Sequence, residues 1–69
     1  MYEVWMIRKP DGKGGYSYYA YMSGYAPEFI ANKEQAKHFK TEKKAQAAFK
    51  EVGIYVVGSE VVKTTVQVL

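Results

Sequence analysis

The chain has 69 residues, of which 48% are hydrophobic, 16% aromatic and 25% charged, a balance typical of one small globular domain covering residues 1–69. This composition is too apolar for a disordered chain, and no run of about 18 apolar residues is present to cross a membrane. Because cysteine is absent, disulfides and thiolate metal sites are excluded. We expect a cytoplasmic protein without metal or cofactor.

The first third of the sequence predicts a β-hairpin. Residues 2–8 are rich in aromatic and β-branched side chains, and residues 9–15 contain a proline and three glycines, which predict a loop. Residues 16–23 predict the second strand. Alternation along it would place four residues on each face: Tyr16, Tyr18, Ala20 and Met22 on one, and Ser17, Tyr19, Tyr21 and Ser23 on the other. Gly24 and Pro27 predict the end of this strand.

The middle of the chain predicts two helical segments with a break between them. At roughly 100° per residue, Ala36 and Phe39 lie nearly opposite a second apolar set, which consists of Ala45, Ala48, Phe49 and Val52. One straight helix could not bury both sets against one sheet. We therefore expect a short first helix beginning at Asn32, a break near residues 40–41, and a main helix over about 42–52. Thr41 is a suitable N-cap for the main helix and Gly53 a suitable C-terminal residue.

The last third predicts one or two further strands. Residues 54–57 and 60–68 are β-branched, and the intervening Gly58-Ser59 predicts either a tight hairpin turn or a bulge in one bent strand. Val62, Thr64, Val66 and Val68 would share a face. The resulting fold is α+β, with three or four antiparallel strands in ββαβ or ββαββ order, one main helix and a short helical turn before it. Since one helix covers one face of a sheet, we expect the other face to be open.

The residues that carry common enzyme chemistry are sparse. His38 is the single histidine, and no cysteine or paired carboxylate accompanies it to complete a zinc site. A nucleophilic triad would have to join His38 to Asp11, the single aspartate, which lies in the glycine-rich loop. The spacing of Gly12, Gly14 and Gly15 does not match a phosphate-binding loop that leads into a helix. We therefore predict a protein that is not an enzyme.

The aromatic residues point to non-covalent protein binding, because tyrosine and tryptophan are enriched in protein interfaces. The candidate contact residues gather in the first hairpin: Trp5, Tyr16, Tyr18, Tyr19, Tyr21 and Tyr25. An edge strand of the sheet could also pair across a two-fold axis and form a homodimer.

The basic residues support an alternative, single-stranded nucleic-acid binding. The formal net charge is +3, and lysines crowd the helical region. Sheet tyrosines would stack bases while cationic side chains neutralise phosphates. The candidate cations are Arg8, Lys9, Lys13, Lys43, Lys44 and Lys50.

Residues 29–45 contain the spacing Ala36-x-x-Phe39-x-Thr41-x-x-x-Ala45. This A-x-x-F-x-T-x-x-x-A segment resembles one found in short, uncharacterised accessory proteins of Gram-positive bacteriophages and prophages. The resemblance implies a phage protein in the host cytoplasm that binds a host or phage protein and modulates it, for example by inhibiting a defence nuclease. It transfers no catalytic or binding residue to this chain.

Overall fold

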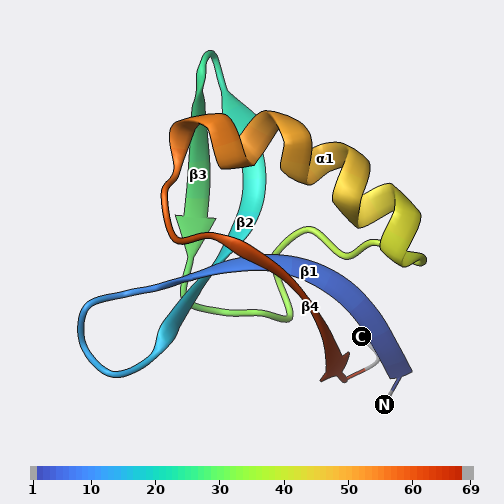
Figure 1. The fold of residues 1–69 in the computed structure, drawn as a ribbon. Helices are drawn as coiled ribbons and strands as arrows, with labels where there is room; N and C mark the ends of the chain where they lie inside the picture. The colour runs from blue at the N-terminus through green and yellow to red at the C-terminus, as the bar shows by residue number, and fades with distance from the viewer. Residues whose placement is uncertain (1, 68–69) are drawn as a thin grey trace.

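A computed structural model describes residues 2–67 of the chain. The strands form one four-stranded sheet, and Figure 1 shows how the helix lies across it. The elements are β1 (Tyr2–Pro10), β2 (Tyr16–Ser23), β3 (Ala26–Ile30), α1 (Glu42–Tyr55) and β4 (Glu60–Val66). All neighbouring strands are antiparallel, in the spatial order β3-β2-β1-β4. The predicted α+β class is confirmed, but the order along the chain is βββαβ because one more strand precedes the helix.

The central strand β1 is buried on both of its faces. Met6 and Ile7 are each 0% exposed although neighbouring side chains in a strand point in opposite directions. Ile7 packs with Val52 of α1, whereas Met6 packs in a second cluster with Ala36, a residue of the segment that connects β3 to α1. The expectation that the face opposite the helix is open is therefore wrong at β1, because this connecting segment covers it.

The connecting segment also fills a gap in the sheet. β1 pairs with β2 only from Arg8 to Pro10. Beyond that point Phe39 exchanges two backbone hydrogen bonds with Trp5 of β1, both 2.8 Å long, and the Lys37 amide donates to the carbonyl of Tyr19 in β2 at 2.9 Å. Figure 1 shows this segment in yellow-green, leading from the end of β3 to the start of α1.

The predictions for residues 24–40 are confirmed in part. The second strand ends at Ser23 as predicted, but the sequence analysis missed β3, an edge strand in which the missing amide hydrogen of Pro27 is tolerated. No helix is assigned from Asn32; the segment expected there is a single turn at residues 33–35, closed by the Gln35 amide donating to the Asn32 carbonyl at 3.1 Å and the Ala36 amide donating to the Lys33 carbonyl at 3.3 Å. The Asn32 side chain accepts a hydrogen bond from the Glu34 amide at 3.0 Å, which stabilises this turn.

The predicted start of the main helix is confirmed and its predicted end is wrong. The Thr41 side chain accepts a hydrogen bond from the Lys44 amide at 3.2 Å, which caps α1. The helix then passes through Gly53 and ends at Tyr55, so the predicted strand at residues 54–57 does not form. Gly58, with φ of +91°, makes the turn from the helix into β4 rather than a hairpin. Val68, which was predicted to end the last strand, lies outside the described residues.

The predicted alternation along β2 holds only for its first half. The pairing of β2 with β3 shifts register between Tyr19 and Tyr21, as a bulge does. Met22 therefore packs in the same cluster as Tyr19, under the helix, although strict alternation placed the two on opposite faces. Tyr19 packs edge-on against the Phe29 ring, with ring centroids 6.0 Å apart.

Tyr19 should make the stability of the domain depend on alkaline pH. Burial raises the pKa of its phenol, and the nearby charge of Glu51 raises it further. The folded state therefore retains this proton at a pH where the unfolded chain loses it, above about 10. The stabilisation is complete below that pH and is lost as pH rises through the folded pKa. We expect wild type to lose stability relative to Tyr19→Phe between about pH 9 and about pH 11, measured by urea denaturation. Parallel stability curves for the two proteins would contradict this expectation.

Candidate functional site

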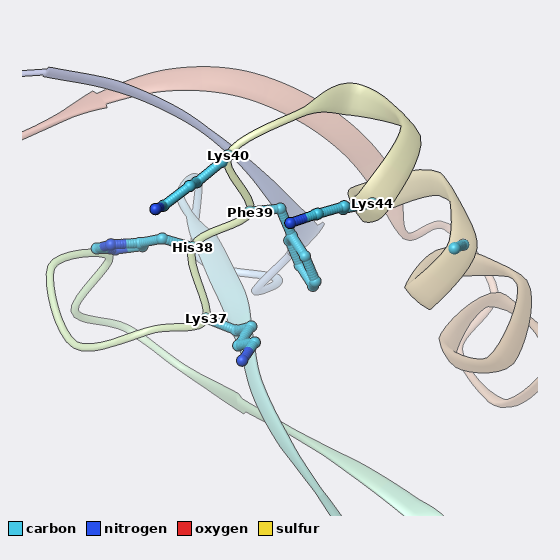
Figure 2. Close-up of a pocket in the computed structure, with 6 residues that line it drawn as sticks. Lys37, His38, Phe39, Lys40 and Lys44 are labelled. Carbon is cyan, nitrogen blue, oxygen red and sulfur yellow. The ribbon is translucent and has the colours of Figure 1, made fainter.

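A basic hollow lies where the connecting segment meets α1. Its volume is about 480 Å³, and it is lined by Lys37, His38, Phe39, Lys40, Lys44 and Ala47. Figure 2 shows Lys37, Lys40 and Lys44 on different sides of the Phe39 ring. We call these six residues the basic hollow.

The local structure explains why these side chains converge. Residues 37–39 are held in the sheet by their hydrogen bonds to β1 and β2, and Thr41 starts the helix directly afterwards. Lys44 and Ala47 lie three residues apart, so they project from the same side of α1. The hollow is thus bounded by a pinned, extended segment on one side and by the first turns of a helix on the other.

The electrostatics of the hollow favour an anion. Lys37, Lys40 and Lys44 are exposed, and no ion pair in residues 2–67 involves any of them. The N-terminal end of α1 adds the partial positive charge of its amides, although Glu42 in the first turn opposes part of it. Cations that are close together and unpaired repel one another, and a bound anion would relieve this repulsion.

His38 is oriented by a single hydrogen bond. Its Nε2 lies 2.8 Å from the carbonyl oxygen of Lys33, so Nε2–H donates to that oxygen. This bond turns the ring away from Phe39 and toward the turn at residues 33–35, as Figure 2 shows. The Nδ1 atom has no hydrogen-bond partner among the described residues and remains able to contact a ligand.

The groups that line the hollow are suited to binding an anion. Its lining contains three ammonium groups, one imidazole and one aromatic ring, and it includes neither a carboxylate nor a hydroxyl nucleophile. No group of three or more histidine, cysteine, aspartate or glutamate side chains in the described part of the chain could hold a metal ion. Such a lining can hold phosphate or carboxylate oxygens through the lysines and an unsaturated ring against Phe39.

The cations predicted from sequence are spread over the molecule, and Lys44 is the one that lines the hollow. The Arg8 Nε donates to Glu60 at 2.9 Å while its guanidinium lies 3.8 Å from the Tyr16 ring centroid. Partial burial lowers the pKa of Arg8, but the hydrogen bond to Glu60 and the charge interactions with Glu60, Tyr16 and Tyr18 together outweigh it, so the pKa is raised. Arg8 is thus committed to contacts inside the chain.

The other four predicted cations lie in three separate places. The Lys9 ammonium is 4.9 Å from the Phe29 ring centroid, and Lys13 lies in the β1–β2 loop. Lys43 and Lys50 are exposed on α1 and are outside the lining of the hollow. None of these four lysines lines the hollow with Lys44.

The structure also disperses the aromatic residues of the predicted protein-binding surface. Tyr19 is 9% exposed in the core, and Trp5 and Tyr18 are half-buried. Tyr16 is partly exposed beside Arg8. Tyr21 and Tyr25 are 58% and 85% exposed at the β2–β3 hairpin. The six aromatic residues therefore do not share one face of the sheet.

A second exposed group was not predicted from sequence. Ile54, Tyr55 and Val57, at the C-terminal end of α1, are 74%, 53% and 97% exposed. We call these three residues the apolar end. The sequence placed them in a strand, where alternation would have buried part of the set.

Sequence reasoning missed Lys37, His38, Phe39 and Lys40 as site residues. The signal was present, since Lys37-His38-Phe39-Lys40 is a cationic run with one aromatic residue. It was assigned to a helix, where these four side chains would have pointed in different directions. Hydrogen bonds to distant strands fix the backbone of residues 37–39 instead, and the four residues line one hollow beside the start of α1.

No family model, curated protein or solved structure matches this chain. In the described residues no helix is long and apolar enough to cross a membrane.

Proposed function

We propose that this protein is a non-catalytic binding module for single-stranded nucleic acid, with backbone phosphates held at the basic hollow. One observation carries the proposal: three lysines that have no ion-pair partner among residues 2–67 line one hollow together with the half-buried ring of Phe39, which also packs against the cluster of Ile7, Tyr19 and Val52. Phosphates on a flexible strand can reach all three ammonium groups while a base rests on Phe39. A rigid duplex keeps its bases stacked inside and could not use the ring.

The test compares two variants that remove the same charge from different places. The hollow variant replaces Lys37, Lys40 and Lys44 with glutamine, and the control variant replaces Lys13, Lys43 and Lys50 with glutamine. Binding of a fluorescent oligodeoxythymidylate of about 16 nucleotides is followed by anisotropy as salt is varied. We expect the hollow variant to bind at least about tenfold more weakly than wild type and the control variant to bind nearly as well.

The salt dependence provides a second readout. Loss of three phosphate contacts should reduce the slope of log affinity against log salt by about 2 in the hollow variant, since each contact to a single strand contributes about 0.7. Equal weakening in both variants would mean that binding follows net charge and that the hollow is not the site. If a glutamate-rich peptide competed as well as the oligonucleotide, the ligand would be an acidic protein segment instead.

A second function, protein binding, is favoured by the apolar end. Side chains as apolar as Ile54 and Val57 are rarely left this exposed next to one another without a partner. Under this proposal the partner is a host or phage protein, in keeping with the phage accessory proteins that the sequence resembles. A partner captured by wild type should be lost with Ile54→Asp and Val57→Asp and kept by the hollow variant. Retention by both aspartate variants would exclude the apolar end as the contact.

A further inference from the structure

The two edges of the sheet differ in how well they are protected against pairing with another strand. β3 forms one edge, and it is five residues long, contains Pro27 and lies beside the bulged part of β2. Short length, proline and bulges are the usual devices that block an edge strand. β4 forms the other edge, and its seven residues, Glu60 to Val66, include neither proline nor glycine and pair with β1 without a register shift.

The hydrogen bonds of Trp5 show which backbone groups of β4 are free. The amide and carbonyl of Trp5 both bond to Phe39, so they point away from β4. Backbone groups of successive residues in a strand point to opposite sides, so those of Val4 and Met6 point toward β4. Their cross-strand partners Thr64 and Val62 therefore bond to β1.

It follows that Val61, Lys63 and Thr65 direct their amides and carbonyls outward from the sheet. No strand in residues 2–67 lies beyond β4 to receive them. The edge thus presents a continuous row of donors and acceptors.

The charged residues of this edge have ion-pair partners inside the chain. The Lys63 ammonium lies 3.6 Å from a Glu3 carboxylate oxygen, and Glu60 pairs with Arg8 at 2.9 Å. Edge lysines repel an incoming strand when they are free, and here the charge is partly balanced by a partner on β1. The remaining side chains of β4 are valine and threonine, which are favourable in cross-strand pairs.

We propose that β4 pairs antiparallel with β4 of a second copy of this chain, across a two-fold axis at Thr64. A second copy fits because an antiparallel edge is complementary to itself: the rotated strand places its donors opposite the first strand's acceptors. In this register Thr64 faces Thr64 of the second copy, Val62 faces Val66, and Lys63 exchanges both hydrogen bonds with Thr65. Moving the axis to Lys63 would place two ammonium groups opposite each other, which disfavours that register.

The two-fold axis stands perpendicular to the joined sheet, so both helices lie on the same face of it. The contact is one strand wide and falls at the small end of specific interfaces, so the dimer should form reversibly with concentration. The proposal is independent of nucleic-acid binding, since it depends on the backbone of β4 alone.

Amide hydrogen exchange and sedimentation velocity, both without nucleic acid, test the proposal between about 10 µM and about 1 mM protein. We expect the sedimentation coefficient to rise from monomer to dimer over this range. The amides of Lys63 and Thr65 should become protected in parallel with it, while those of Val62 and Thr64 are protected at every concentration. A monomer throughout, with exchange at Lys63 and Thr65 independent of concentration, would overturn the proposal.

Two substitutions at one position separate pairing from folding. Thr65→Pro removes an amide hydrogen that points outward, so it should keep the fold, judged by circular dichroism, and remove the dimer. Thr65→Val keeps the amide and should still dimerise. A dimer that persists in a folded Thr65→Pro protein would contradict pairing through β4. Should Thr65→Pro unfold, the exchange of Lys63 and Thr65 in wild type decides the question.

Discussion

Replacing Val52 with aspartate should unfold the domain. Val52 is 1% exposed and packs against Ile7 and Tyr19 between the helix and the sheet. A carboxylate there would lose its hydration without gaining a cationic partner, since that cluster consists of apolar and aromatic side chains. The expected cost is more than about 4 kcal/mol, against a total stability of roughly 3 to 10 kcal/mol for a chain of this length. Circular dichroism at 25 °C and thermal melting measure it.

The matched control is the same change two residues later, Ile54→Asp. Ile54 is in the same helix but is 74% exposed, so the new carboxylate remains in water. We expect a loss of less than about 1 kcal/mol, mostly from placing negative charge near the helix C-terminus. If the two variants were equally stable, α1 would not pack on the sheet through Val52.

Replacing Met6 with alanine should cost about 2–5 kcal/mol, as much as replacing Ile7 with alanine. The two residues point to opposite faces of β1 and are both fully buried, Ile7 under α1 and Met6 under the connecting segment. Both substitutions remove a large side chain from a packed site and leave a cavity. Urea denaturation of the two variants provides the free energies of unfolding.

Met22→Ala is the control for this comparison, because Met22 is the same residue type in a half-buried position. Its expected cost is smaller, since less buried surface is removed. A small cost at Met6 with a large one at Ile7 would mean that the face opposite the helix is open, as the sequence alone indicated.

The basic hollow and the β4 edge are two separate surfaces of the same molecule. The hollow is built at the start of α1, and the edge is built by the last strand. A dimer through β4 would carry two hollows on one face of a continuous sheet. One nucleic-acid strand that reached both would bind more tightly than either hollow alone, because the second contact forms at high local concentration.

Local chemistry explains which elements the sequence predicts correctly. The hairpin of β1 and β2 follows from two apolar strands joined by a glycine-rich loop, and the start of α1 follows from the capping side chain of Thr41. These features depend on residues within a few positions of one another. The elements predicted wrongly depend on distant residues. β3 forms because β2 supplies its hydrogen bonds, and α1 continues through Gly53 although isolated glycine disfavours helix.

The sequence by itself determines the α+β class, the position at which the main helix begins, the excess of positive charge, and the absence of cysteine chemistry. Tertiary structure alone decides that residues 37–39 enter the sheet and that both faces of β1 are covered. It also decides that the five tyrosines and the tryptophan predicted as contact residues do not share one face of the sheet. The physical reason is that backbone amides and carbonyls need hydrogen-bond partners. A short segment without a strong preference for helix or strand therefore adopts the backbone conformation that pairs its own groups and those of neighbouring strands. Here the unpaired groups of Trp5 and Tyr19 set that backbone, and the basic hollow is its consequence.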